Sequence, residues 1–168
     1  MSALRSFNQI SPKLGERVYI DPACTVIGDV TIGDDSSIWP YTVIRGDVNF
    51  IRIGARTNIQ DGTIIHVSHD WLVGKQIGYA TLIGDDVTIG HGAIIHACTI
   101  EDGCLIGMGS TVLDGAVVKK NGFVGAGAVI RPEIVIGSNA VVGAGAVVTK
   151  DVPDGAKVVG NPARAVET

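Results

Sequence analysis

The sequence predicts an all-β protein folded as a parallel β-helix, and three observations support this fold class. Aliphatic or aromatic residues recur every six positions over most of the 168-residue chain. Glycine often follows the aliphatic residue, and a small or branched residue often lies four positions after it. A fixed period of six with this pattern is typical of hexapeptide-repeat β-helices. The repeated positions are Leu14, Ile20, Val26, Ile32, Ile38, Ile44 and Phe50, and then Ile100, Ile106, Val112, Val118, Val124, Ile130, Ile136, Val142 and Val148.

The period also predicts the geometry of the coils. Three hexapeptides form one triangular coil, so residues about 18 apart stack about 4.8 Å from each other. Ile, Val and Leu fill the interior, and glycine is expected at the corners because it reaches positive φ without strain. A helical or Rossmann domain is disfavoured, since the sequence has neither a sustained 3.6-residue apolar period nor a GxGxxG motif in a βαβ context.

The length and composition indicate a single domain over residues 1–168. Within it, the repeat pattern predicts coils over about 13–152, a loop near 67–80 and a capping tail at 153–168. A hydrophobic content of 46% with a net charge of -4 argues against disorder. The mild acidity argues against nucleic-acid binding. Neither an apolar run of about 18 residues nor a signal pattern is visible, so we expect a cytoplasmic protein without a membrane partner.

Three cysteines, Cys24, Cys98 and Cys104, cannot all pair within one chain, and the sequence has no CxxC motif. Free cysteine behaves as a small apolar residue. We therefore expect buried, reduced thiols.

The six-residue register breaks at three places. Ile44 and Ile53 are nine residues apart, so either one side of the coil is short or about three residues near Asp47 to Phe50 bulge out. Ile95 and Ile100 are only five apart. The stretch from Val67 to Tyr79 fits the repeat poorly and is predicted to be a protruding loop.

Three histidines lie at defined positions of the repeat. His66 and His96 each follow an isoleucine, in the slot that usually holds glycine, and are 30 residues apart. If about twelve residues loop out between them, they lie one coil apart and can share a metal ion. His91 occupies a different slot, so a neighbouring subunit of a trimer would complete the site. Three imidazoles with a fourth position open for water form a catalytic zinc arrangement. The alternative is that each histidine is an ordinary hydrogen-bonded residue, as we expect for His69 in the loop.

Polar residues gather near the same breaks. Because buried charges need partners, we expect Arg45 to pair with Asp47 or with Asp61. Such a pair is either a plain ion pair at a trimer interface or part of an active site. In the second case, Gln60 and Asp61 would orient a metal-bound water or its ligands.

These residues bring the sequence close to a known family. VIRGD at 43–47, GARTNIQDG at 54–62 leading to His66, GH at 90–91 and HAC at 96–98 resemble the gamma-class carbonic anhydrases over roughly residues 10–115. The resemblance implies a left-handed β-helix, a homotrimer, and Zn²⁺ (or Fe²⁺) held by His66 and His96 of one subunit and His91 of its neighbour. It implies further that Arg45 and Asp47 form an interface salt bridge beside the site and that Gln60 and Asp61 bind the metal-ligated solvent. The implied reaction is hydration of CO2 to bicarbonate by a metal-bound hydroxide, which makes the enzyme a lyase.

The chain departs from this family at the residues that transfer the released proton away from the metal site. Highly active members use glutamates, one just after the Arg-x-Asp motif and others in an acidic loop. This chain has Val48 at the first place, and its loop offers only His69 and Asp70. We therefore expect weak or absent hydration activity even if the metal site is intact.

The C-terminal third departs more strongly. Family members usually leave the coils for a long α-helix, whereas here the repeat continues to Val148 and ends in a tail containing GNPAR at 160–164. This ending resembles hexapeptide acyltransferases, which bind coenzyme A and use a histidine as general base, a role for His66 or His91. A tail that merely caps the last coil is the preferred interpretation. A structural scaffold of engineered or recombined origin, which keeps the metal site while the extra coils add stability, is a further alternative.

Overall fold

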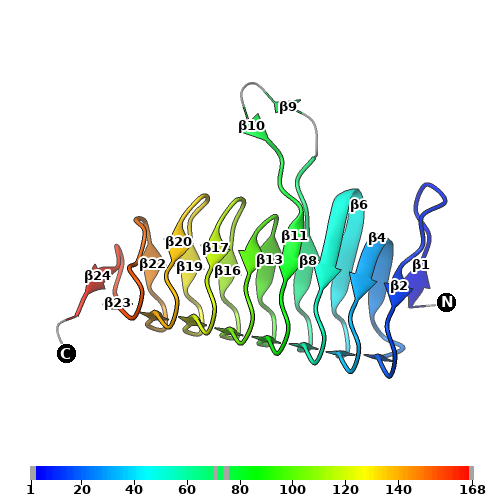
Figure 1. The fold of residues 1–168 in the computed structure, drawn as a ribbon, viewed down its shortest axis with the longest axis horizontal. Coiled ribbons are helices and arrows are strands. Elements are labelled where there is room, and N and C mark those ends of the chain that lie inside the picture. The colour runs from blue at the N-terminus through cyan, green and yellow to red at the C-terminus, as the bar shows by residue number, and fades with distance from the viewer. Residues whose placement is uncertain (1–2, 70–71, 74–75, 167–168) are drawn as a thin grey trace.

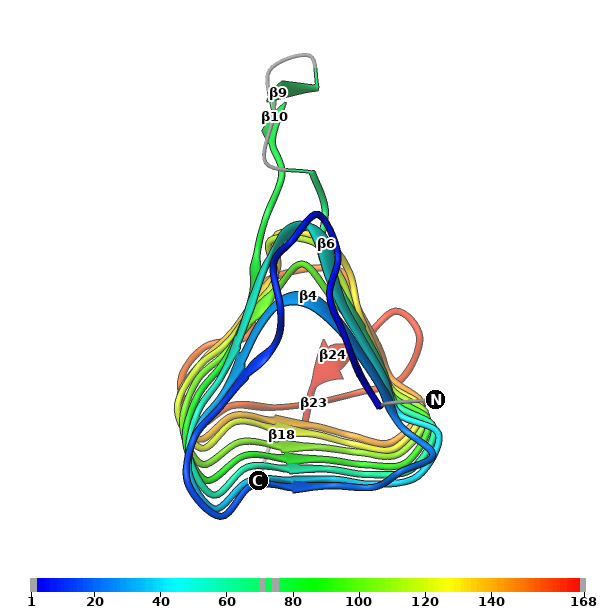
Figure 2. The same cartoon turned by 90° about the vertical axis from the view of Figure 1, so that its right-hand side faces the viewer.

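The computed structural model describes residues 3–69, 72–73 and 76–166, and it confirms the predicted fold class. The coils stack along one axis with the two termini at opposite ends (Figure 1). Viewed from the N-terminal end, each coil is triangular and turns counterclockwise as it recedes, so the β-helix is left-handed (Figure 2). The described part of the chain contains no α-helix and therefore lacks a long C-terminal one. Among these residues no helix could span a membrane.

The strands of the described residues form three sheets, of which the largest covers two faces of the triangle. It contains β1 (Leu4–Arg5), β2 (Lys13–Leu14), β4 (Thr25–Ile32), β6 (Val43–Ile53), β8 (Ile64–His66), β11 (Thr81–Ile83), β13 (Ile94–His96), β14 (Thr99–Ile100), β16 (Thr111–Val112), β17 (Val117–Val118), β19 (Val129–Ile130), β20 (Val135–Ile136) and β22 (Val147–Val148). The long strands β4 and β6 bend over one corner and join the two faces (Figure 2).

The second sheet forms the third face, and the third is a small hairpin. The second sheet contains β3 (Tyr19–Ile20), β5 (Ser37–Ile38), β7 (Asn58–Ile59), β12 (Thr88–Ile89), β15 (Leu105–Ile106), β18 (Phe123–Val124), β21 (Val141–Val142), β23 (Lys157–Val159) and β24 (Arg164–Ala165). β24 runs antiparallel to β23 at the C-terminal end of the coils. The hairpin consists of β9 (Leu72–Val73) and β10 (Gln76–Ile77).

The core is a set of stacked aliphatic ladders. Regular coils pair residues 18 apart, as Val118 pairs with Ile136, so side chains of the same hexapeptide slot lie above one another. Every predicted interior position from Val26 to Ile44 and from Ile100 to Val148 is at most 1% exposed. Burial of this much apolar surface is the main force that holds short strands in register.

Two predicted interior positions are wrong. Phe50 is 39% exposed, because the pairing shifts from Gly28–Gly46 to Val30–Ile51 and so leaves three extra residues in β6. This is the bulge that the sequence offered as one of two alternatives. Leu14 is 38% exposed, since it lies near the open N-terminal end, where β2 pairs only with β4.

Among the described residues, ten glycines, such as Gly62 and Gly92, have the predicted positive φ, but the glycines that follow an interior aliphatic residue serve another purpose. Gly33, Gly84 and Gly137 follow an interior aliphatic residue, but their φ angles are not positive. They are required because the next coil passes so close that a Cβ at Gly33 would lie 2.7 Å from the backbone nitrogen of Ala55. Positive φ occurs at other corner residues, including non-glycine residues such as Arg56.

The predicted loop is present and leaves the coils at the corner crossed by β6 (Figures 1 and 2). β8 and β13 pair with an offset of 30 residues, twelve more than a regular coil. The neck of the loop is closed by the backbone N–H of Ser68, which donates to the carbonyl of Tyr79 at 3.1 Å.

All three thiols are free and buried, as the sequence predicts. Burial raises the pKa of Cys98 to about 12 and that of Cys104 to about 11, and it also raises the pKa of Cys24. Since the thiolate is the reactive form, we expect no alkylation by iodoacetamide in the folded protein at pH 8 and three adducts after unfolding in guanidinium chloride. Intact-mass spectrometry would check this, and rapid labelling of the folded protein would contradict it.

Candidate metal centre

The twelve looped-out residues bring His66 and His96 together. The two histidines are direct partners on the parallel strands β8 and β13. Their ring centroids are 5.1 Å apart, and Nδ1 of His66 lies 3.1 Å from Nε2 of His96. The hydroxyl of Thr81, at the first position after the loop, donates to the carbonyl of His66 and accepts the backbone N–H of Ala97 at 2.9 Å. The loop ends are thus tied to both histidine strands.

The two rings lie in the middle of a chain of polar contacts. Arg45 donates from Nη1 to Asp47, whose Oδ1 lies 2.9 Å from Nε2 of His66. On the other side, Nδ1 of His96 lies 2.9 Å from Oδ2 of Asp114. The predicted Arg45–Asp47 pair is therefore formed. Asp47 is the first of the four β6 residues, 47–50, that lie opposite the single residue Asp29 of β4.

The charges of this chain are set by burial and by its contacts. Burial lowers the pKa of His66 and keeps its ring neutral, which is the metal-binding form. Burial alone would raise the pKa of Asp47, but the hydrogen bonds from His66 and Arg45 outweigh it and lower that pKa. Asp47 therefore remains an anion that only accepts hydrogen bonds.

The hydrogen-bond roles leave two lone pairs facing each other. Asp47 takes the N–H of His66 at Nε2, and Asp114 takes the N–H of His96 at Nδ1. The facing atoms, Nδ1 of His66 and Nε2 of His96, are then both acceptors, and a proton or a metal cation between them relieves their repulsion. Two imidazoles on a tetrahedral zinc ion have nitrogens about 3.3 Å apart, close to the spacing here. The pair therefore fits two ligands of such an ion.

His91 lies away from this pair, as the sequence predicts. It occupies the corner before β13, whereas His96 ends that strand. Its Nδ1 is 3.0 Å from Oδ2 of Asp61, and its side chain is 53% exposed. Among the described residues no three His, Cys, Asp or Glu side chains converge on one metal position. A single subunit thus provides only two of the three histidines at one place.

Gln60 and Asp61 belong to the His91 end of the face. Together with Trp39, Asn58 and His91 they line a hollow of about 260 Å³. Within one subunit the alternative Arg45–Asp61 pair does not form, since Asp61 contacts His91 and Arg45 contacts Asp47. Of the four candidate catalytic residues, Arg45 and Asp47 therefore adjoin His66, while Gln60 and Asp61 adjoin His91.

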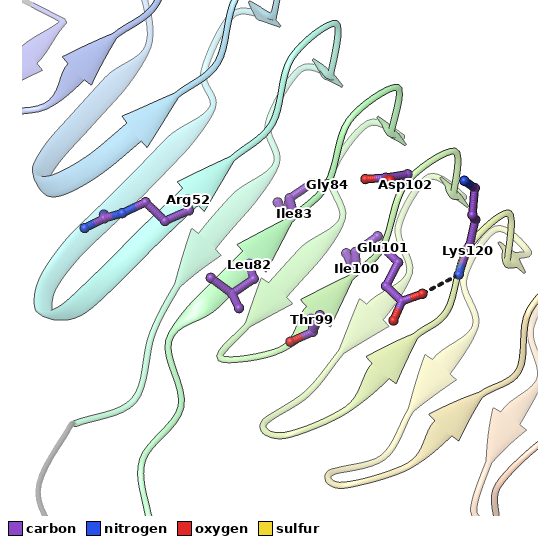
Figure 3. Close-up of a pocket in the computed structure, with 9 residues that line it drawn as sticks. All are labelled: Arg52, Leu82, Ile83, Gly84, Thr99, Ile100, Glu101, Asp102 and Lys120. Atoms are coloured by element: carbon purple, nitrogen blue, oxygen red, sulfur yellow. Dashed lines mark hydrogen bonds between the residues drawn. The ribbon is translucent and has the colours of Figure 1, made fainter.

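Another hollow lies on a different face and lacks such chemistry (Figure 3). It measures about 290 Å³ and is lined by β6, β11 and β14, with Arg52 and Lys120 at its two ends. Its carboxylates are already engaged, since Glu101 accepts the backbone N–H of Lys120 at 2.9 Å and Asp102 accepts that of Asp85 at 2.9 Å. Histidine is absent from its lining.

Comparisons with known proteins agree with the repeat and with the histidine motifs. The family model for the bacterial transferase hexapeptide matches residues 11–46 and 80–114, and that for the hexapeptide repeat of succinyl-transferase matches 115–150. Gamma carbonic anhydrase 2, a mitochondrial protein of Arabidopsis thaliana, is 53% identical over 111 residues, 66% of this chain and 39% of that protein. The chain belongs to the hexapeptide-repeat proteins, and over 66% of its length it is similar to a gamma carbonic anhydrase.

Two further proteins are similar to this chain. Protein YrdA of Escherichia coli is 50% identical over 66% of this chain and 60% of its own length. The crystal structure of a hexapeptide transferase family protein from Anaplasma phagocytophilum is 36% identical, with a TM-score of 0.70, and the match covers 98% of this chain and 82% of that one. The match thus covers 39% and 60% of the length of these two curated relatives but 82% of the transferase-family structure.

Sequence reasoning missed one residue of the candidate site, Asp114. The signal was available, because Asp114 lies 18 residues after His96 and the coil period places it beside that ring.

Proposed function

We propose that this protein hydrates CO2 reversibly at a Zn²⁺ (or Fe²⁺) site shared between subunits of a homotrimer. The observation that carries the proposal is the pair of imidazoles whose nitrogens face each other at 3.1 Å, with a carboxylate behind each ring. Metal-ligating histidines typically have this second partner. Relatives named carbonic anhydrase support the reaction.

His66 and His96 of one copy and His91 of a neighbouring copy would hold the metal. His91 is exposed at one end of the face formed by β8 and β13, and the histidine pair lies at the other end. The outward side chains between them include Ile64 and Ile94, which are 46% and 41% exposed. Apolar side chains on this face favour contact with a second copy. In a closed ring of three copies, each histidine pair would receive one His91 from a neighbouring copy.

The residues around the two histidines would orient the imidazole rings and compensate the charge of the carboxylates. A bound zinc ion supplies Lewis acidity and a water that is nucleophilic at neutral pH. Asp47 and Asp114 fix the two rings, and Arg45 balances the charge of Asp47. Gln60 and Asp61 would enter the site with His91 and offer hydrogen bonds to solvent and to bicarbonate.

We propose a slow reaction, because groups that could export protons are scarce. Both oxygens of Asp47 are engaged by Arg45 and His66, and the next residue is Val48. Of the two loop residues considered for proton transfer, His69 lies at the loop base, while Asp70 lies outside the described residues.

An acyltransferase is the second candidate, and one observation favours it. Asp61 holds Nδ1 of His91 at 3.0 Å, and the other ring nitrogen of His91 has no partner among the described residues. This arrangement suits a general base for an acceptor hydroxyl or amine. The transferase-family structure that matches most of the chain is consistent with it. The candidate requires coenzyme A binding.

The deciding experiment measures metal per subunit by mass spectrometry in protein purified with and without oxygen, alongside stopped-flow CO2 hydration. The wild type is expected to carry close to one Zn²⁺ or Fe²⁺ per subunit. His91→Ala is expected to lose most of the metal and hydration together, because it removes one of three ligands. His69→Ala is the matched histidine control and is expected to keep the metal, because His69 is not among the proposed ligands.

Other outcomes separate the alternatives. Stoichiometric metal without hydration in the wild type would support a scaffold with a retained site, including one of engineered or recombined origin. Coenzyme A binding without metal would support the acyltransferase. Full metal content in His91→Ala would contradict the shared site.

A further inference from the structure

We infer that Asp114 is a positioning residue, which holds His96 in the single tautomer that leaves Nε2 free to bind a metal. The inference rests on the proposed metal site for its consequence, but its structural basis is independent. Oδ2 of Asp114 lies 2.9 Å from Nδ1 of His96, and Nε2 of the same ring is directed at His66. Asp114 comes from the next coil, in the turn between β16 and β17.

The backbone around Asp114 is held firmly. Its carbonyl accepts the N–H of Glu133 at 2.8 Å, and the N–H of Gly115 donates to the carbonyl of Ala97 at 2.7 Å. The ring of Tyr79, from the loop neck, lies over Gly115 so closely that a Cβ there would be 2.9 Å from the ring. The hydroxyl of Tyr79 donates to Glu133 at 3.2 Å. A carboxylate fixed in this way imposes its position on a neighbouring ring.

The tautomer matters because a neutral imidazole offers only one lone pair. An exposed histidine exchanges its proton between the two nitrogens, so a ligand nitrogen is free for part of the time only. Asp114 accepts hydrogen bonds and does not donate them, so it retains the proton at Nδ1. The negative charge behind the ring also makes Nε2 a stronger ligand.

The chain offers variants that separate this role from folding. The side chain of Asp114 is 36% exposed, so its truncation leaves no buried cavity. Asp114→Ala removes the acceptor, whereas Asp114→Asn keeps an oxygen acceptor and removes only the charge. Glu133→Gln removes one negative charge from the same corner without touching His96, and it serves as the charge control.

Two measurements test the inference. In metal-free protein, side-chain ¹H–¹⁵N spectra should show His96 protonated at Nδ1 in wild type, Asp114→Asn and Glu133→Gln, and redistributed toward Nε2 in Asp114→Ala. Chelator competition should show zinc affinity lowered about 10–100-fold in Asp114→Ala, lowered less in Asp114→Asn, and unchanged in Glu133→Gln. Thermal midpoints should agree across the set.

The outcomes distinguish this inference from the proposed function. An unchanged His96 tautomer in Asp114→Ala would overturn the inference, whatever the zinc result. A changed tautomer with unchanged zinc affinity would also overturn it, because the ring would not need positioning. If the His96 tautomer changes in Asp114→Ala but the wild type binds no zinc, the hydrogen-bond role of Asp114 is supported and the proposed function is overturned instead.

Discussion

Substitution of Gly125 by alanine is expected to lower the free energy of unfolding by about 3 kcal/mol. Gly125 follows the interior residue Val124, and a Cβ on it would lie 2.7 Å from the carbonyl carbon of Gly143 and 2.8 Å from Cα of Ala144. Both are backbone atoms of the next coil, which cannot move aside as a flexible side chain can. The coils would have to separate locally, with loss of hydrogen bonds such as that from Gly125 N–H to Val142 at 2.8 Å.

Gly127→Ala is the matched control, two residues along the same turn. A Cβ at Gly127 would meet no atom within 4 Å, so the only cost is its φ of 67°. Arg56, Asp86 and Asn121 adopt similar φ angles in this structure. We therefore expect a loss of about 1 kcal/mol. Urea unfolding followed by circular dichroism would compare the two, and equal midpoints would show that coil spacing does not depend on Gly125.

Val48→Glu is expected to raise the turnover of CO2 hydration by about 100-fold, provided that the proposed reaction takes place. Each hydration releases a proton, and the structure offers no free acceptor next to Asp47, whose oxygens contact Arg45 and His66. Val48 lines a cavity of about 250 Å³ beside the bulge, together with Asn49 and Phe50. A glutamate in that position has room to turn outward and exchange protons with buffer.

Val48→Gln controls for size and polarity, because it fills the same space without an exchangeable carboxyl proton. Stopped-flow hydration at several buffer concentrations, normalised to metal content, would measure the effect. Equal rates for the glutamate and glutamine variants at equal metal content would show that proton export does not limit the reaction.

Site residues whose positions follow from the coil period could be predicted from the sequence, whereas those that depend on the bulge could not. His66 and His96 could be placed together because 30 residues equal one coil plus a loop of twelve, and the coil period is a sequence property. Asp114 follows from the same period, although it was overlooked. The pairing of Asp47 with His66 could not be derived, since it depends on whether the nine-residue gap shortens a side or forms a bulge.

Phe50 and the repeat glycines show where pattern reasoning fails. Phe50 continues the six-residue count but lies in the bulge, and Ile51 takes the interior place instead. Counting cannot choose between these residues, because both are apolar and the choice depends on which one fits the stack. Likewise, positive φ explains glycines such as Gly62 but not Gly33, which is required by the short distance to the next coil.

The sequence by itself determined the β-helix, its coil length, the position of the loop and the histidines that face one another. These features depend on a short apolar period, which is repeated often enough to override local exceptions. Only the tertiary structure decided the path of β6 through its bulge, the partners of Arg45 and Asp61, and the role of Asp114. These depend on contacts between coils, where a shift of one residue exchanges an inward side chain for an outward one.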